Sequence, residues 1–204
     1  MSPLSAFERL TPVVSACSIL AVALAAGTNL STTIITLPAL VHASPSVLAT
    51  QWKTLYDGGL LPVVSLTMTS AVGFATLAYR SALNPGLAPT GLISHTKRNL
   101  YIAAAVAAFS LAPYTGLVMR DVILKLSKQA EAVKATDAKT KVAKSSFANV
   151  WDDIEELERS AKAAAELNEK GDTHELVRKW GTLNGYRGCM LLSSAVFGLW
   201  ATAS

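Results

Sequence analysis

The sequence predicts an all-α fold, a bundle of four transmembrane helices with an extra-membrane helical insertion between the third and the fourth helix. The first observation is compositional, because 51% of the 204 residues are hydrophobic and only 16% are charged, with a mean hydropathy of +0.37. An ordinary soluble domain is less apolar. The second observation is that the uncharged stretches are as long as a bilayer is thick. We therefore expect a single membrane domain over residues 1–204, embedded in a lipid bilayer.

The uncharged stretches define the expected spans. A helix needs about 20 mostly apolar residues to cross the hydrocarbon core. No charged residue occurs over the 28 residues 13–40, or over the 20 residues of either 60–79 or 100–119. A fourth stretch, about 186–203, is shorter but mostly apolar. We expect these four stretches to span the membrane, and residues of about 121–179 to form a soluble helical excursion.

The connection after the first span is rich in chemically useful side chains. Pro38 is expected to end that span, and the connection over residues 41–59 contains His42, Trp52 and Tyr56. The spacing of Trp52 and Tyr56 is i, i+4, so a helix that begins before Trp52 would present both on one face. Two interpretations stay open, a surface for an aromatic ligand and an aromatic belt at the level of the lipid headgroups.

The next two segments are simpler. Residues 80–99 contain prolines and glycines and are expected to form a plain interfacial loop. The third span carries Pro113, Tyr114 and Thr115 near its end. A proline inside an apolar helix frees a backbone carbonyl, which a nearby hydroxyl can satisfy. Such a break is expected either to line a cavity or to be a structural kink.

The charged part of the chain follows the third span. Residues 120–179 contain 12 Lys or Arg and 12 Asp or Glu, a balance typical of solvated helix rather than of a nucleic-acid surface. Residues 151–168 have the apolar spacing of an amphipathic helix, which Gly171 would end. Asp172 and Glu175 resemble a capping box, so a last helix is expected to begin there.

The last helix carries a polar and aromatic motif as it enters the fourth span. On a helix, Trp180, Asn184 and Arg187 fall within roughly 60° of one another. A second stripe, where another backbone can approach closely, consists of Gly181, Gly185 and Gly188. An amide that enters the membrane needs a partner, whereas Arg187 could also reach lipid phosphates by snorkelling.

A four-span topology puts the first and the third connection on the same side of the membrane. His42, Trp52 and Tyr56 are then expected at the same mouth of the bundle as the Trp180–Arg187 motif. Eight Lys or Arg residues flank the spans on this side, against four on the other. We therefore expect a multi-pass protein of an internal membrane whose candidate site faces the cytosol.

Three patches of residues carry a resemblance to a known family. The patches are Trp52, Tyr56, Gly59 and Pro62, then Pro113 to Met119, then Trp180, Leu183-Asn184 and Arg187. Together they resemble the anthrone oxygenase family, small four-helix membrane proteins of aromatic polyketide pathways such as the noranthrone and emodin anthrone oxygenases. After Met119 that family usually continues with Pro-Thr-Asn, whereas this chain continues with Arg120-Asp121. One amide of the family pattern is therefore missing.

The resemblance implies a monooxygenase of secondary metabolite biosynthesis. Its substrate would be an anthrone, a planar aromatic polyketide, oxidised to an anthraquinone with molecular oxygen as co-substrate and without a metal or flavin cofactor. Removing a proton from the central methylene of an anthrone gives an extended enolate that can pass an electron directly to oxygen. Such a site needs a base, a stabiliser for the enolate oxygen, and a dry flat pocket.

Roles for the candidate residues follow from that implied chemistry. His42 is the preferred base, because an imidazole exchanges a proton near neutral pH, and Asp57 is its rival. Arg187 and Asn184 would stabilise the developing oxyanion by hydrogen bonds. The expected substrate-binding residues are Trp52, Tyr56, Tyr114, Thr115 and Trp180.

Other functions stay open at this stage. A non-catalytic four-helix scaffold or interaction protein would need only the helix-packing faces. A homo-oligomer is also open. The two cysteines lie far apart in apolar stretches, and no spacing of Cys and His resembles a metal site. We expect neither a metal nor a nucleic-acid partner.

Overall fold

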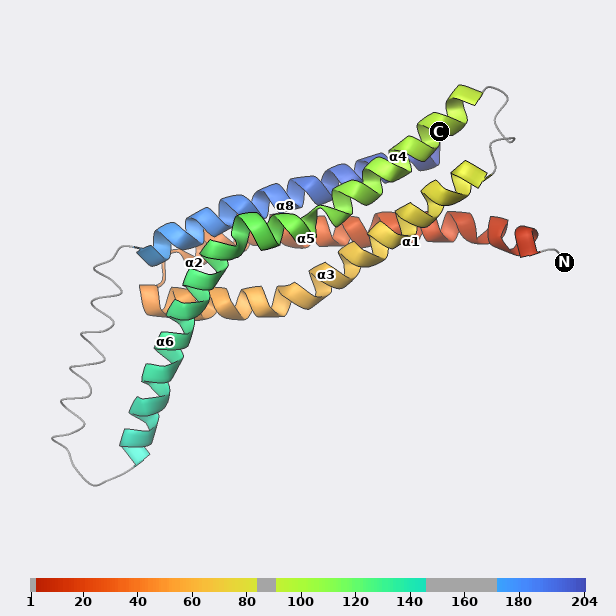
Figure 1. The fold of residues 1–204 in the computed structure, drawn as a ribbon. Helices are drawn as coiled ribbons and strands as arrows, with labels where there is room; N and C mark the ends of the chain where they lie inside the picture. The colour runs from red at the N-terminus through yellow and green to blue at the C-terminus, as the bar shows by residue number, and fades with distance from the viewer. Residues whose placement is uncertain (1–2, 84–90, 146–171) are drawn as a thin grey trace. The chain divides into compact units, whose positions relative to one another are not determined.

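The computed structural model describes residues 3–83, 91–145 and 172–204, and these are helical almost throughout (Figure 1). In chain order the elements are α1 (Pro3–Ser31), the π-helix η1 (Thr32–Thr36), α2 (Leu37–Leu40), α3 (Pro45–Leu83), α4 (Gly91–Phe109), α5 (Leu111–Tyr114), the π-helix η3 (Thr115–Met119), α6 (Arg120–Ser145) and α8 (Asp172–Ala203). The predicted all-α class is therefore confirmed for the described part of the chain. The start of the last helix at Asp172 is confirmed too, while the predicted helix over 151–168 and its end at Gly171 lie outside the described residues.

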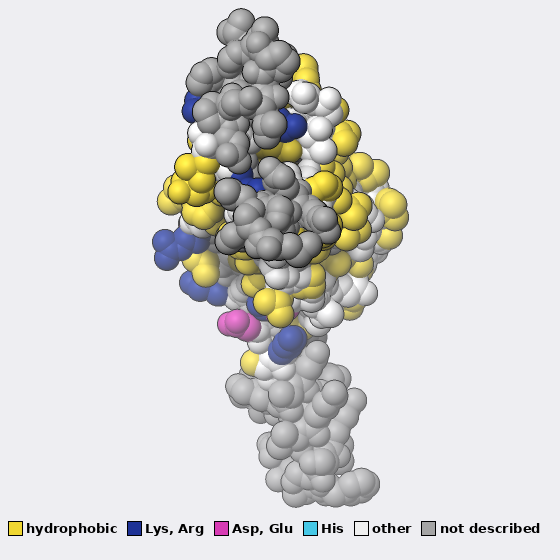
Figure 2. Space-filling model, turned by 90° about the vertical axis from the view of Figure 1, so that its right-hand side faces the viewer, with side chains coloured by type: hydrophobic (Ala, Val, Ile, Leu, Met, Phe, Trp, Pro, Cys, Tyr) yellow, Lys and Arg dark blue, Asp and Glu magenta, His cyan; other side chains and the backbone are white. Residues whose placement is uncertain are grey.

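Three stretches of helix are long and apolar enough to cross a membrane, namely Leu10–Leu40, Pro45–Leu83 and Thr96–Thr136. They contain the first three predicted spans. Within the described residues α8 does not join them, because Arg187 and several small polar residues lower the hydropathy of its apolar half. Large hydrophobic side chains are exposed on these helices, as helices that face lipid require. In Figure 2, which shows one face, the exposed hydrophobic side chains are yellow.

The first connection is much shorter than predicted. Only residues 41–44 lie outside the helices there, because α3 begins at Pro45. Proline suits the first position of a helix, where its missing N–H would have no partner anyway. The prediction of a connection over 41–59 is therefore wrong, and Trp52 and Tyr56 lie on α3.

The predicted interfacial loop over 80–99 is also wrong at both ends. Helix α3 continues to Leu83 and α4 begins at Gly91, so Lys97 and Arg98 lie on a helix. Ala, Leu and Arg residues at the end of α3 and the start of α4 are good helix formers, so both helices extend into the region that was predicted as a loop.

Two prolines lie beside π-helical turns. The third span is interrupted near Pro113, because α4 ends at Phe109 and α5 begins at Leu111, and the π-helix η3 begins two residues after the proline. Thr115 Oγ1 donates to the carbonyl oxygen of Leu111 at 2.8 Å. Pro38 lies in α2 just after η1, and the helix continues to Leu40. The prediction that Pro38 ends the first span is therefore wrong. At Pro38 the π-turn lies on the N-terminal side, where the carbonyl left without the proline N–H is located, and the chain stays helical. Such turns often lie at functional sites.

The chain forms two compact units, which are described separately. Unit 1 consists of Met1–Ser31, Gly59–Val118 and Asn184–Ser204, and unit 2 of Thr32–Gly58 and Met119–Leu183. The core of unit 1 is built from α1, α3, α4 and α8, and its largest members include Val22, Phe74, Leu77, Tyr101 and Leu191.

The helices of unit 1 lie side by side (Figure 1). A hydroxyl hydrogen bond links two of them, and a glycine allows a close approach. Ser70 Oγ donates to the carbonyl oxygen of Ser18 at 2.9 Å, which links α3 to α1. A Cβ atom at Gly188 of α8 would lie 2.7 Å from Leu30 Cδ2 of α1, so the absence of a side chain lets these two helices approach. Small residues and hydroxyls are the usual means of packing helices in lipid.

Unit 2 has its own buried interior. Its largest buried side chains include Leu48, Trp52, Met119, Leu126 and Val177. The His174 ring nitrogen Nε2 lies 3.2 Å from the carbonyl oxygen of Ala43, a hydrogen bond that ties the start of α8 to the turn before α3.

Candidate functional site

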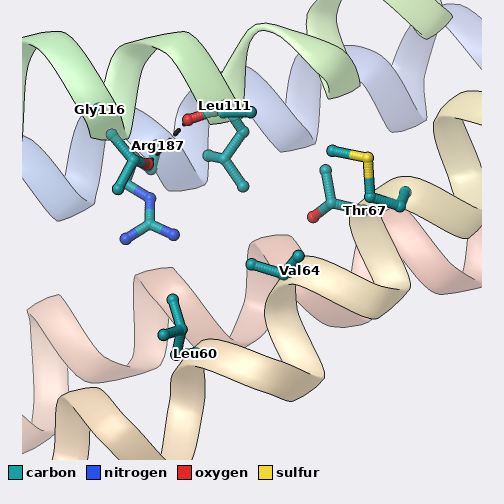
Figure 3. Close-up of a pocket in the computed structure, with 9 residues that line it drawn as sticks. Leu60, Val64, Thr67, Leu111, Gly116 and Arg187 are labelled. Atoms are coloured by element: carbon teal, nitrogen blue, oxygen red, sulfur yellow. Dashed lines mark hydrogen bonds between the residues drawn. The ribbon is translucent and has the colours of Figure 1, made fainter.

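Unit 1 contains a half-enclosed pocket of about 300 Å³ between α3, the α5–η3 segment and α8 (Figure 3). This volume is at the lower end of the range of about 300–1,000 Å³ that is typical of small-molecule sites. The lining residues are Leu60, Val64, Thr67, Met68, Leu111, Ala112, Thr115, Gly116 and Arg187. The break at Pro113, which the sequence predicted as a cavity or a kink, therefore adjoins a cavity.

Arg187 carries the one charge among the residues that line the pocket. It is only 5% exposed, and its guanidinium points toward the side of the pocket that Leu60 of α3 forms (Figure 3). Snorkelling of Arg187 to lipid phosphates is therefore the wrong interpretation, because that would require an exposed side chain.

Asn184 positions the arginine. Arg187 Nη1 donates to Oδ1 of Asn184 at 3.4 Å, and Asn184 Nδ2 donates to the carbonyl oxygen of Asn29 on α1 at 3.0 Å. Asn184 is buried, as is Asn29. The amide thus has the partner that a polar group in the membrane needs, and it fixes the last helix against the first.

Apart from Arg187, the pocket wall is mostly apolar, because its two threonine hydroxyls donate their protons to the backbone. Thr67 Oγ1 donates to the carbonyl oxygen of Val63 at 2.7 Å, and Thr115 Oγ1 donates to that of Leu111 at 2.8 Å. Both hydroxyl protons are therefore directed to the backbone of their own helices. A ligand in this pocket would meet aliphatic groups, hydroxyl oxygens and one cation.

The sequence around Arg187 supplies almost no negative charge. Neither Gly59–Val118 nor Asn184–Ser204 contains an Asp or a Glu, and the remaining segment of unit 1 contains only Glu8. A cation in surroundings of low polarity attracts an anionic oxygen more strongly than a cation in water does. The pocket is therefore suited to a ligand that carries or develops a negative charge.

The structure brings together some of the predicted residues of this site and adds others. Thr115 lines the pocket, whereas Tyr114, its neighbour in the chain, is not among the lining residues. The wall formed by α3 was missed by the sequence reasoning. Its members are spaced i, i+4, i+7 and i+8 from Leu60, so a search for a helix face across from the motif on α8 could have found them.

Three predicted aromatic residues form a cluster in unit 2. The rings of Trp52 and Tyr56 stack, with centroids 5.3 Å apart and planes at 14°. Trp180 meets Trp52 edge to face, with centroids 5.7 Å apart and planes at 88°. Trp52 has no exposed surface, so it does not belong to an aromatic belt at the headgroups.

Two buried donors belong to the same cluster. Among the described residues, neither Nε1 of Trp52 nor Nε1 of Trp180 has a hydrogen-bond acceptor, although both atoms are buried. A buried indole N–H usually finds a partner. The binding role of both tryptophans stays a prediction.

The two candidate bases differ in their surroundings within unit 2. His42 lies in the turn before α3, and its side chain is exposed. Asp57 Oδ1 accepts a hydrogen bond from Lys53 Nζ at 2.8 Å in an exposed ion pair. Asp57 therefore has a cationic partner one helical turn away, and the choice of His42 as base stays a prediction.

Comparison with known proteins identifies a family whose model matches the chain. A family model described as anthrone oxygenase matches residues 52–197, which is well over half of the chain. No curated protein and no solved structure matches the chain. The match covers the aromatic pair of α3, all residues that line the pocket, and the motif of α8.

Proposed function

Because the chain belongs to the anthrone oxygenase family, we propose that it oxidises an anthrone to the corresponding anthraquinone with molecular oxygen. The substrate is a planar aromatic polyketide. The observation that carries the proposal is the buried guanidinium of Arg187 as the only charge in an otherwise apolar pocket of unit 1. Such a pocket favours a flat apolar molecule that becomes an anion during the reaction.

The reaction needs no reductant, because the substrate supplies all the electrons. A base removes one proton from the central methylene, and the resulting enolate passes one electron to oxygen. The two radicals combine to a peroxide at the methylene carbon. Loss of the second methylene hydrogen as a proton, with cleavage of the O–O bond, gives the new carbonyl and water. One oxygen atom enters the ring and the other leaves as water, so we propose that neither a metal nor a flavin takes part.

Arg187 and Asn184 stabilise the enolate oxygen in this proposal. Deprotonation puts negative charge on that oxygen, and a preorganised cation in an apolar pocket lowers the energy of the charged state more than that of the neutral ketone. The contact between Arg187 and Asn184 holds the guanidinium before the substrate ionises. Less reorganisation is then needed during the reaction.

The other predicted roles are part of the same proposal. His42 is the base, with Asp57 as its rival. Trp52, Tyr56 and Trp180 bind the aromatic substrate, and the buried indole N–H groups of the two tryptophans suit its carbonyl and phenol oxygens. Thr115 contributes to the pocket wall, and Tyr114 binds the substrate beside it.

We also propose that α8 is a fourth span and that the site faces the cytosol from an internal membrane. Helix α8 packs along the apolar helices of unit 1, because Ser194 Oγ donates to the carbonyl oxygen of Ala104 on α4 at 2.7 Å. Large apolar side chains such as Leu199 and Trp200, 60% and 62% exposed, cover its outer side. A bilayer would bury them.

Oxygen consumption tests the proposal most directly. The purified protein in detergent is mixed with hydroxylated anthrones in air, oxygen uptake is followed with an electrode, and the anthraquinone is identified by its absorbance and mass. We expect uptake of one oxygen molecule per quinone formed, well above the autoxidation seen with heat-denatured protein. Under nitrogen the quinone should not form.

The same experiment with isotopically labelled oxygen tests whether an oxygen atom from O₂ enters the product. With ¹⁸O₂, one labelled atom should appear in the new carbonyl. If the folded protein forms quinone no faster than the denatured control for any anthrone, the oxygenase proposal is wrong and the non-catalytic scaffold becomes the better description.

A further inference from the structure

A second hollow in unit 1 shares no residue with the pocket beside Arg187. It is a groove of about 420 Å³ between α3 and α4. Its main lining residues are Ala75, Tyr79 and Ala82 of α3 and Arg98, Ile102 and Val106 of α4. The proposed reaction leaves this groove without a role.

The groove opens to the surroundings of the helices. Tyr79, Ile102 and Val106 are 66%, 45% and 62% exposed, and they lie in two of the membrane-length stretches. Exposed apolar side chains in such stretches face lipid. The alanines on α3 are small and leave room for a chain between the two helices.

One end of the groove is cationic. Arg98 lies at the start of the stretch Thr96–Thr136, so it is expected near the boundary of the hydrocarbon core. Its Nε atom is buried and has no hydrogen-bond partner among the described residues. No Asp or Glu occurs anywhere between residues 75 and 106, so the segments of α3 and α4 that line the groove contain no carboxylate.

The cation and the apolar walls form one elongated site. Helices α3 and α4 are consecutive and antiparallel (Figure 1), and Arg98 is close in sequence to their connection. Arg98 and Val106 are eight positions apart, which corresponds to about 12 Å of helix. A matching ligand therefore has an anionic head and an apolar tail that runs from the boundary into the hydrocarbon region.

We propose that this groove binds one anionic phospholipid. The phosphate accepts hydrogen bonds from Arg98, and one acyl chain lies along the alanines of α3 and along Ile102 and Val106 of α4. Guanidinium groups suit phosphate oxygens because their N–H donors can form paired, charge-assisted hydrogen bonds. Basic sites between membrane helices are places where lipid headgroups bind.

Native mass spectrometry of the full-length protein tests the proposal. The protein is stripped of lipid in detergent and titrated with phosphatidylglycerol or with phosphatidylcholine of the same acyl chains. We expect phosphatidylglycerol to bind at least about tenfold more tightly, and Arg98→Ala to weaken its binding by about tenfold or more, as for the loss of charge-assisted hydrogen bonds. Arg98→Lys should restore part of the affinity.

Two further variants distinguish the contribution of the lipid headgroup to binding from that of the acyl chain. Ala75→Phe fills the groove at an exposed position and should weaken phosphatidylglycerol binding although Arg98 is present. Lys97→Ala removes a neighbouring cation that does not line the groove and should leave binding within about twofold. Circular dichroism should show wild-type helix content in all variants.

Three outcomes would overturn the inference. Equal affinities of the wild type for both lipids would remove the selectivity for an anionic head. Unchanged binding in folded Arg98→Ala would remove the role of the guanidinium. Displacement of the lipid by glycerol phosphate at equal concentration would show a site for free phosphate rather than for a phospholipid.

Discussion

The side-chain amide of Asn184 donates to the backbone carbonyl oxygen of Asn29 at 3.0 Å, across 155 positions of the chain. This hydrogen bond joins α8 to α1 at the level of Arg187. It anchors the residue that in turn contacts the guanidinium, so the position of the only charge in the pocket depends on a contact between the first and the last helix.

Replacing that amide should cost stability and activity together. Asn184→Leu keeps a similar volume but removes the donor, and buried hydrogen bonds of this kind contribute about 1–2 kcal/mol. Thermal unfolding in detergent should show the loss. Thr182→Ala is the control, because Thr182 lies on the same helix with an exposed side chain. If both variants lose the same stability, the hydrogen bond is not the cause.

Removing the charge from the pocket should affect the reaction more than the fold. Arg187→Ala should lower kcat/KM for an anthrone by about 100-fold or more, as expected for the loss of one preorganised stabiliser of a developing oxyanion. Arg187→Lys should lie between this variant and the wild type, because it keeps the charge but not the planar fork. Steady-state oxygen uptake measures both.

The neighbouring Tyr186 provides the control for that experiment. It lies on the same helix but is 58% exposed, so Tyr186→Phe should keep nearly wild-type kinetics. Wild-type rates in a folded Arg187→Ala protein would remove the proposed role of the arginine.

Filling the pocket should block the substrate without disturbing the fold. A Cβ atom at Gly116, in the π-helix η3, would meet nothing within 4 Å, and Gly116 lines the pocket. Gly116→Phe should therefore raise KM or abolish turnover while leaving the unfolding temperature within a few degrees. Leu117→Phe, at a position that is 82% exposed on the same turn, should keep its activity. Equal activity of the two variants would place the substrate elsewhere.

A second glycine should behave in the opposite way. A Cβ atom at Gly188 would lie 2.7 Å from two side-chain atoms of Leu30, so Gly188→Ala should separate α8 from α1 and cost about 1–3 kcal/mol, as overpacking does. Gly27→Ala meets nothing within 4 Å and should be neutral or stabilising, since alanine has the higher helix propensity. Unfolding by denaturant compares the two, and a stable Gly188→Ala protein would contradict the close approach.

In the aromatic cluster of unit 2, replacing Trp52 with Phe should destabilise the protein less than replacing it with Ala. Trp52 is fully buried and stacks on Tyr56, so Trp52→Ala should cost about 3–5 kcal/mol, whereas Trp52→Phe keeps a ring in contact and should cost less. Trp200, 62% exposed, provides the control Trp200→Ala. A Trp52→Ala protein as stable as that control would show that the stacked pair is not part of the interior.

The sequence by itself determined the membrane-length helices and the motif on α8. A continuous charge-free stretch as long as a bilayer is thick favours a helix, because a helix pairs all backbone groups of the stretch within itself. The spacing of Asn184 and Arg187 places them on one helix face wherever that helix packs, and both are buried in the structure. The break that the sequence predicted near Pro113 is also present, because α4 ends at Phe109 and α5 begins at Leu111.

Only the tertiary structure decided which face of α3 completes the pocket and where the chain turns. Leu60 and Val64 carry no signal that distinguishes them from other apolar residues of the same span, because residues 60–79 of α3 carry no charge on any side. Its orientation depends on contacts far away in sequence, such as the hydrogen bond from Ser70 to Ser18. Likewise Pro38 and Pro45 look alike in the sequence, yet one lies within a helix and the other begins one. Local propensity sets the helices, whereas helix packing selects the residues that meet.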